Sequence, residues 1–275
     1  MLYDLGYYPV LRCPRCGLRW AGPAGDGLPD SARPADRPLV VGDLPAHEAK
    51  ATRDLAMIAP RLAAGASILD VGSGGGAFLA VASAAGFSVT GLEPDSQRAA
   101  LARSTYGVTV HETRLEDCTL PEASFQAVVA FCVIAHVESP LRFLQAAACL
   151  LQPGGLLFLH TPAADGLYKL VAAATYRGSL GRVGGPLRHQ YMPWGHRYIL
   201  GPRAMGAALE GAGFVTAEFS PYSNPAEITN RRFDARPAWQ RLPLTGAVTA
   251  INAASRVSGR TNHLAVFAHR SGAVS

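Results

Sequence analysis

The feature that most constrains the fold is a regular alternation of short apolar runs and helical patterns between residues 66 and 162. The apolar runs are SILDV, FSVTGLE, VTVHE, FQAVVAFCVI and LLFLHTP, and stretches with helical periodicity separate most of them. Strands joined by crossover helices form parallel sheets, because each helix brings the chain back to the end of the sheet at which the preceding strand began. We therefore predict a three-layer α/β sandwich whose ligands bind at the C-terminal ends of the strands.

The segments on either side of this alternation are less regular. Residues 1–45 contain a Cys-x-x-Cys pair and many Gly, Pro and Asp residues, so we expect an irregular arm there. Residues 46–65 have the pattern of an amphipathic helix that ends at Gly65. Gly, aromatic and His residues interrupt the rhythm at 162–201, before a helix and a strand follow, and NHLAVFAHR near the C-terminus fits an edge strand. We divide the chain into the arm and a domain of residues 46–275.

The composition indicates a soluble globular protein, since 49% of the residues are apolar. The longest apolar runs have about nine residues, whereas a membrane-spanning helix needs roughly 20. The N-terminus has no basic start followed by an apolar run, so we predict no secretory signal. Five scattered cysteines do not make a disulfide framework and suit a reducing compartment. We therefore expect a cytoplasmic protein that does not bind a membrane.

The charged residues are distributed unevenly along the chain, whose formal net charge is +5. Residues 1–160 hold 12 basic and 15 acidic side chains, and residues 161–275 hold 13 and 5. A basic surface can serve a nucleic acid or an anionic acceptor. However, 23 of the 25 basic residues are Arg in an Ala- and Gly-rich chain, and they are dispersed, which indicates a coding bias. We therefore do not favour nucleic-acid binding.

The sharpest motif is SILDVGSGGGAF at residues 67–78, where an apolar strand ends in Asp70 and four of the next six residues are glycines. Glycines allow a ligand to lie against backbone N–H groups at the start of a helix. A dinucleotide loop needs the pattern G-x-G-x-x-G, but position 77 is Ala. The carboxylate of Asp70 suits a ligand with a positive amino group better than one with a diphosphate.

The number of residues between the glycine loop and the next strand-end acidic residue indicates a function for that residue. The strand SVTGLE ends in Glu93, which lies 21 residues after Gly72. This spacing is typical of a carboxylate that binds both hydroxyls of a ribose. A strand-end Glu can also be a solvated turn residue, but the preceding loop favours ribose binding.

At four stretches the sequence resembles the class I S-adenosylmethionine-dependent methyltransferases, closest to the small-molecule branch that includes ubiquinone-type and sugar methyltransferases. The stretches are ILDVGSGGGAF, GLEPD, FQAVVAFCVIAHVESP and LLQPGGLLFLHTP, and they span residues 67–162 in the family's order and spacing. The resemblance implies a Rossmann-like fold with a mostly parallel seven-stranded sheet, S-adenosylmethionine as cofactor, a small-molecule acceptor, and an acceptor lid at about 162–201.

The resemblance also implies roles for individual residues. Its implied donor contacts are Asp70 with Gly72, Ser73 and Gly74 for the methionine end, Glu93 for the ribose, Leu115 and either Glu116 or Asp117 for the adenine, and Phe131 near the sulfonium. The chain departs from the family at Arg114, Gln126 and Ala135, where the family often has acidic residues. We interpret the donor side as intact and the acceptor side as altered, with a donor-binding homologue that lacks catalysis as an alternative.

Methyl transfer is an in-line displacement that needs alignment and a deprotonated nucleophile. His136 lies just beyond the fourth strand of the pattern and is a candidate base, although it could instead cap a helix or fill a packing position. The segment RHQYMPWGHRYILGP at 188–202 gathers further His and aromatic residues. We hypothesise that His196 and Tyr198 face the donor methyl group, and a small core under a long loop is the alternative.

The stretch VLRCPRCGLRW has the form of half a zinc knuckle, because Cys13 and Cys16 supply two of the four ligands that zinc needs. In several resembling methyltransferases, two such pairs precede the core domain. This pair resembles the second one, so either the start codon is assigned too late or the first pair has been lost. We expect no stoichiometric zinc in this chain. A zinc-ribbon module that binds nucleic acid is a further alternative.

Overall fold

The computed structural model describes residues 1–4, 9–22, 44–185, 187, 191, 196–223 and 238–272. The chain divides into two compact units. Unit 1 comprises Met1–Arg37, Thr161–Met205 and Ser220–Leu264, and unit 2 comprises Pro38–His160, Gly206–Phe219 and Ala265–Ser275. Among the described helices, none combines the length and the apolar character that a membrane-spanning helix requires. The predicted boundary near residue 45 stays a prediction.

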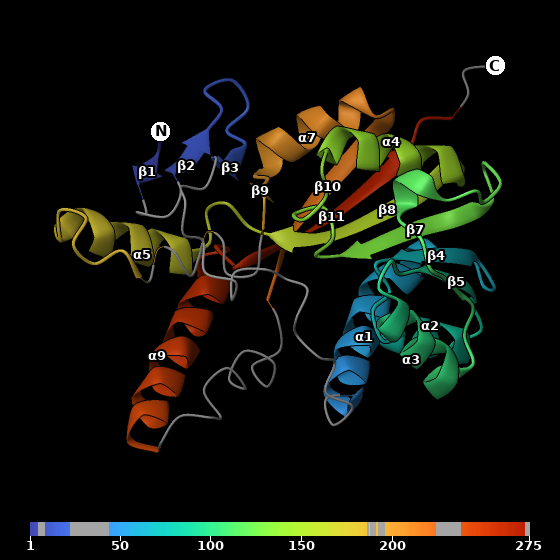
Figure 1. Cartoon of the computed structure of the whole chain (residues 1–275), viewed down its shortest axis with the longest axis horizontal. Coiled ribbons are helices and arrows are strands. Elements are labelled where there is room, and N and C mark those ends of the chain that lie inside the picture. The colour runs from blue at the N-terminus through green and yellow to red at the C-terminus, as the bar shows by residue number, and fades with distance from the viewer. Residues whose placement is uncertain are drawn as a thin grey trace. The chain divides into compact units, whose positions relative to one another are not determined.

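A seven-stranded sheet, most of whose residues belong to unit 2, forms the centre of that unit (Figure 1). Its strands in spatial order are β10 (Phe214–Tyr222), β11 (His263–Arg270), β8 (Leu151–Pro162), β7 (Phe125–Phe131), β4 (Ser67–Val71), β5 (Ser88–Leu92) and β6 (Val110–His111). The pairs β8–β7, β7–β4, β4–β5 and β5–β6 are parallel. The predicted α/β class with a mostly parallel seven-stranded sheet is confirmed.

The inner strands are apolar without alternation, which is typical of strands covered on both faces. Four of the five residues of β4 and five of the seven residues of β7 are buried. The expectation that the C-terminal strand lies at an edge of the sheet was wrong. β11 lies between β8 and β10, and its central residues, Leu264–Ala268, are all buried. Such a continuous buried run fits an inner strand, whereas its place along the chain says nothing about its neighbours.

Helices cover both faces of the sheet. Figure 1 shows α1 (Leu44–Ile58), α2 (Ala77–Ala84) and α3 (Ser96–Tyr106) on one side and α4 (Pro140–Leu150) on the other. Helix α7 (Pro202–Gly211) precedes β10. Side chains fix the starts of two helices, because Asp95 accepts a hydrogen bond from the Arg98 N–H before α3 and Ser139 accepts one from Arg142 before α4.

Helix α1 is shorter than its sequence pattern predicts. The pattern continues to Gly65, but α1 ends at Ile58 and a single 3-10 turn, Ala59–Arg61, follows. Pro60 lies in that turn, and a proline cannot continue the hydrogen bonds of an α-helix. The helix is therefore limited to the length that precedes the proline.

Unit 1 contains a small antiparallel sheet of four strands in the order β1 (Tyr3–Asp4), β2 (Pro9–Arg12), β3 (Arg19–Ala21) and β9 (Tyr198–Ile199). The expectation of an irregular arm was therefore wrong for the described residues before position 22. Strands of two to four residues leave no periodic signal in the sequence. Helices α5 (Leu167–Gly178) and α9 (Ala238–Val257) complete this unit and were also missed.

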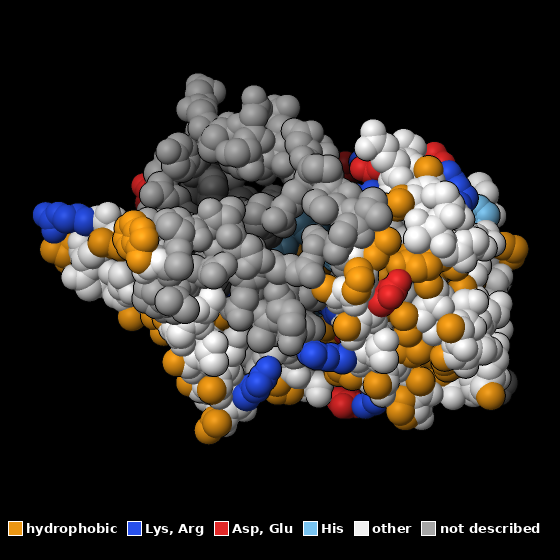
Figure 2. All heavy atoms as spheres, turned by 90° about the horizontal axis from the view of Figure 1, so that it is seen from below, with side chains coloured by type: hydrophobic (Ala, Val, Ile, Leu, Met, Phe, Trp, Pro, Cys, Tyr) orange, Lys and Arg blue, Asp and Glu red, His pale blue; other side chains and the backbone are white. Residues whose placement is uncertain are grey.

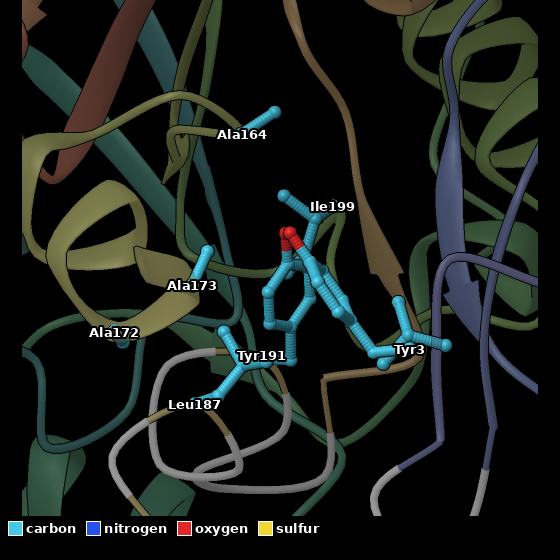
Figure 3. Packing of buried hydrophobic residues seen from close by; sticks show 8 residues of the cluster. Tyr3, Ala164, Ala172, Ala173, Leu187, Tyr191 and Ile199 are labelled. Carbon is cyan, nitrogen blue, oxygen red and sulfur yellow. The ribbon is translucent and has the colours of Figure 1, made fainter. Parts of the chain in front are cut away.

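A buried hydrophobic cluster forms the core of unit 1 (Figure 3). Tyr3 and Tyr191 lie at its centre, with their ring centroids 5.5 Å apart. The guanidinium of Arg19 donates hydrogen bonds to the Tyr191 hydroxyl at 2.7 Å and to the Ala164 carbonyl at 2.6 Å. Tyr191 is only 2% exposed, so this residue of the 188–202 segment is a core residue.

Candidate functional site

The site lies in unit 2, in the loop between β4 and α2. Three glycines of this loop have positive φ angles, of 71° at Gly72, 56° at Gly74 and 84° at Gly76. A Cβ atom on Gly72 would lie 2.6 Å from Val133 Cγ2, and one on Gly76 would lie 2.7 Å from Ala102 Cβ. A Cβ atom on Gly74 would meet no atom of the described residues within 4 Å. Packing therefore requires glycine at Gly72 and Gly76, whereas Gly74 faces space that the described residues leave open.

The end of β5 closes this loop through Glu93, which is buried. One oxygen of its carboxylate, Oε2, accepts a hydrogen bond from the Gly74 N–H at 2.8 Å, and the other, Oε1, accepts one from Asp95 at 3.0 Å. The N–H groups of Gly72 and Ser73 donate to the Leu92 carbonyl at 2.7 and 3.0 Å. Each carboxylate oxygen has two lone pairs, so Glu93 retains acceptor capacity for a ligand hydroxyl.

Asp70 is the most perturbed acidic group of the site. Its side chain is 1% exposed, and neither its Oδ1 atom nor the nearby Ser73 hydroxyl has a hydrogen-bond partner among the described residues. Burial, reinforced by the Glu93 carboxylate, raises the pKa of Asp70 to about 8. Buried polar atoms are normally hydrogen-bonded. A ligand with an ammonium group would satisfy Oδ1 and stabilise the ionised carboxylate.

The ring of Phe131, at the end of β7, forms the apolar wall of this region. It packs against Phe78 of α2 and Phe158 of β8, with centroid distances of 4.8 and 5.6 Å. Phe131 pairs in register with His160, and Asp70 pairs with Val129. Side chains at registered positions of neighbouring parallel strands point to the same face, as do side chains two residues apart on one strand. Asp70 therefore shares a face with Val129, and Val129 shares it with Phe131. Asp70 and Phe131 thus lie on the same face of the sheet.

Comparison with known proteins identifies the family. Residues 46–218 match the family described as "Methyltransferase domain". The chain belongs to the class I S-adenosylmethionine-dependent methyltransferases. The family resemblance that the four sequence stretches suggested is thereby confirmed.

Two relatives illustrate this methyltransferase's place in the family. It is 32% identical to the "Ubiquinone biosynthesis O-methyltransferase" of Xanthomonas axonopodis pv. citri (strain 306) over 182 residues, which cover 61% of this chain and 72% of the relative. It is also 32% identical to the enzyme of that name from Xanthomonas campestris pv. campestris (strain B100) over 202 residues, which cover 68% and 80% of the two chains.

Solved structures agree with this methyltransferase in fold. An S-adenosylmethionine-dependent methyltransferase from Archaeoglobus fulgidus aligns with a TM-score of 0.55 at 14% identity, covering 82% of this chain and 94% of the other. One from Mesorhizobium loti aligns with a TM-score of 0.52 at 20% identity, covering 79% and 97%. At these identities the likeness supports the fold and not the substrate.

The family's cofactor fits the residues that the methyltransferase presents. S-adenosylmethionine carries an ammonium group that suits the buried Oδ1 atom of Asp70, and a ribose that suits Glu93. The open space at Gly74 leaves room for a ligand against the backbone. Further along the sheet edge, Leu115 is buried and Glu116 is half-buried in the 3-10 turn Leu115–Asp117.

Two of the departures from the family pattern have structural roles in the methyltransferase. Arg114 is exposed and forms a 3.7 Å ion pair with Glu138. The Gln126 carboxamide oxygen accepts a hydrogen bond from the Ser67 N–H at 3.1 Å, which ties β7 to β4. Gln126 lies five residues before Phe131, and therefore about 16 Å from the donor end of the strand. Its replacement of an acidic residue does not alter the site directly.

The three predicted catalytic residues lie in different units of the methyltransferase. His136 is half-buried in unit 2, shortly after β7, and its N–H donates to the Val133 carbonyl at 2.8 Å. His196 is 7% exposed in unit 1. Tyr198 is half-buried on β9, opposite Trp20 of β3. His189 and Trp194 of the same segment lie outside the described residues.

The cysteine pair occupies the turn between β2 and β3. The turn is closed by hydrogen bonds from the Cys13 N–H to the Leu18 carbonyl at 2.8 Å and from the Gly17 N–H to the Cys13 carbonyl at 3.0 Å. Backbone N–H groups of Cys16 and Arg15 that point at the Cys13 sulfur lower the pKa of its thiol. The interpretation of this turn as half a zinc knuckle stays a prediction. Among the described residues, no group of three or more potential metal ligands occurs.

Proposed function

We propose that this methyltransferase transfers the methyl group of S-adenosylmethionine to a hydroxyl oxygen of a small aromatic acceptor of the quinone-precursor type. When bound, the donor supplies an electrophilic methyl group on a cationic sulfur. The observation that carries the donor side is Asp70, a buried carboxylate at the end of β4 with an oxygen that has no hydrogen-bond partner among the described residues. The two Xanthomonas relatives named as ubiquinone biosynthesis O-methyltransferases support the acceptor class.

The residues of unit 2 would bind the donor in an extended arrangement along the strand ends. Asp70 would accept hydrogen bonds from the amino group, and the backbone of Gly72, Ser73 and Gly74 would lie along the methionine part. Glu93 would bind the ribose hydroxyls through its remaining lone pairs. At the adenine, Leu115 would donate its N–H and Glu116 would lie close by. Phe131 would face the sulfonium, and an aromatic face attracts such a cation.

Three residues are candidates for the acceptor side. His136 would remove the proton of the acceptor hydroxyl, because a neutral imidazole is a suitable base near neutral pH. The sequence-based assignment of His196 and Tyr198, both in unit 1, to acceptor binding stays a prediction. The alternative to this proposal is a protein that binds the donor but does not catalyse methyl transfer. A turnover assay distinguishes the two.

We also propose that the protein requires neither a structural zinc ion nor a nucleic-acid partner. The Cys13–Cys16 turn offers two thiol ligands, and a structural zinc site needs four, so we propose that purified protein holds no stoichiometric zinc. On the face shown in Figure 2, the described Lys and Arg side chains form no continuous basic patch, and some of them lie beside acidic side chains. This scatter favours a small-molecule acceptor over a nucleic acid. The five cysteines are too scattered for a disulfide framework, which suits a cytoplasmic protein.

An acceptor screen tests the proposal. Purified protein is incubated with methyl-labelled S-adenosylmethionine and with matched compounds that offer a catechol oxygen, an amine nitrogen or an activated carbon. We expect labelled product and S-adenosylhomocysteine in equal amounts from the catechols, including those with a prenyl chain. Donor binding without turnover on any of these compounds would contradict the proposed reaction, and labelled product from the amine alone would replace the acceptor class.

A further inference from the structure

The chain leaves β7 through a residue with an unusual backbone conformation. Cys132, which directly follows Phe131, has a φ of 67°. Within the part of the chain that the structure describes, Ala123 and Leu180 are the only other non-glycine residues with a positive φ. A residue with a Cβ atom is strained in this left-handed region. Such strain persists only where the surrounding contacts hold it, and it is concentrated at functional sites.

Contacts on both sides of Cys132 hold this conformation. Its N–H donates a 2.7 Å hydrogen bond to the His160 carbonyl, which ties the end of β7 to β8. Further along the chain, Ile134 and Ala135 are buried, with exposed fractions of 1% and 0%. The backbone at Cys132 is therefore fixed between a hydrogen bond to β8 and a buried pair of side chains.

The left-handed residue turns the chain back over the glycine loop. Val133, the next residue, packs against this loop, since a Cβ atom on Gly72 would lie only 2.6 Å from Val133 Cγ2. The Val133 carbonyl in turn accepts a 2.8 Å hydrogen bond from the His136 N–H, which closes a turn. An extended residue at position 132 would continue the direction of β7 and carry Val133 and His136 away from Gly72.

We propose that Cys132 is a positioning residue whose left-handed backbone places His136 for proton removal. This inference rests on the proposed function, in which His136 is the base, and adds the element that fixes the position of the base relative to the donor loop. The role belongs to the backbone of Cys132 and not to its thiol. Displacement of a reacting group by about 1 Å can cost roughly 10²-fold in turnover, so the reaction depends on this conformation.

The test is a series of substitutions that differ in their tolerance of a positive φ. Cys132→Val introduces a branched side chain, which the left-handed region excludes most strongly, whereas Cys132→Gly and Cys132→Asn tolerate that region. Turnover of a catechol acceptor is measured at saturating S-adenosylmethionine, and donor affinity is measured by calorimetry. Cys132→Val should lose about 10²-fold in kcat and retain its donor affinity. Cys132→Gly, Cys132→Asn and Cys132→Ala, the last of which removes only the thiol, should exceed it in kcat by about tenfold or more.

A double variant tests whether the effect passes through His136. In a His136→Ala background, Cys132→Val should cause no further loss of kcat, because the base that it displaces is absent. If Cys132→Val does not fold, Cys132→Thr takes its place, since the hydroxyl of a branched threonine suits a half-buried position.

Ala123→Val is the matched control for backbone strain. Ala123 is exposed, has a φ of 52° and lies in the turn before β7. Ala123→Val and Cys132→Val should lower the melting temperature by similar amounts, but only Cys132→Val should lose turnover.

Wild-type turnover in Cys132→Val would overturn the inference, and so would a loss of donor affinity that matches the loss of turnover. Equal losses in Cys132→Gly and Cys132→Val would trace the effect to the side chain, and a full further loss in the double variant would show that Cys132 does not act through His136. Either result would also overturn it. Wild-type turnover in His136→Ala would instead refute the base assignment of the proposed function, and this inference with it.

Discussion

Gly74→Ala is the sharpest single change at the proposed donor site. Gly74 has a φ of 56°, and within the described part of the chain a Cβ atom there would meet no atom within 4 Å. An L-residue in the left-handed region costs about 1–2 kcal/mol. For a chain of this size, such a loss lowers the melting temperature by roughly 2–8 °C. The folded protein should therefore survive the substitution.

Donor binding should respond differently from stability. The added methyl group would project into the space where we place the donor, and overpacking of a close contact costs about 1–3 kcal/mol. The affinity for S-adenosylmethionine should fall by roughly 5- to 150-fold. Calorimetric titration measures this loss, and thermal unfolding without donor measures the strain.

Gly107→Ala is the matched control for this experiment. Gly107 caps α3 with a φ of 65°, and a Cβ atom there would also meet none of the residues that the structure describes within 4 Å. Both variants should lose similar stability, but only Gly74→Ala should lose donor affinity. If Gly74→Ala binds the donor as tightly as Gly107→Ala does, the donor does not lie against Gly74 and the assignment of the loop is wrong.

Three further predictions follow from the same residues. The raised pKa of Asp70 means that the folded state holds a proton that the unfolded state releases, so the unfolding free energy without donor should fall as pH rises from 3.8 towards about 8. In urea unfolding, the unfolding free energy should change by at most about 1.4 kcal/mol per pH unit. The variant Asp70→Asn should reduce this pH dependence and should also bind the donor more weakly. Gly76→Ala should destabilise the fold by about 1–3 kcal/mol in the same assay, because its Cβ atom would lie 2.7 Å from Ala102 Cβ. His136→Ala should lower turnover by about 10²- to 10⁴-fold with unchanged donor affinity, whereas the exposed His111→Ala should change neither.

The local parts of the fold and of the site could be predicted from the sequence. The run SILDV is apolar on both faces and therefore indicates a buried parallel strand, and the glycines after it mark a turn with positive φ angles. The number of residues from Gly72 to Glu93 corresponds to the length of one helix and one strand. Each of these signals lies within one continuous strand–helix–strand stretch, so no knowledge of distant contacts was needed.

The parts that depend on distant contacts were missed. The inner position of β11 is set by pairing with β8 and β10, which no local pattern encodes. Helix α9 contains Pro243 and Gly246, which oppose helix prediction by propensity. The place of Lys50 against the Phe131 ring depends on how α1 packs, and a lysine on an amphipathic helix normally indicates a solvated face.

The central claim is that this chain holds the methyl donor on Asp70 and Glu93 at the ends of β4 and β5. The most direct measurement is an experimental structure of the chain in complex with S-adenosylhomocysteine. We expect the amino group of the ligand within hydrogen-bond distance of Asp70 Oδ1, and both ribose hydroxyls on the Glu93 carboxylate. A ligand bound elsewhere, with Asp70 Oδ1 still without a partner, would contradict the account.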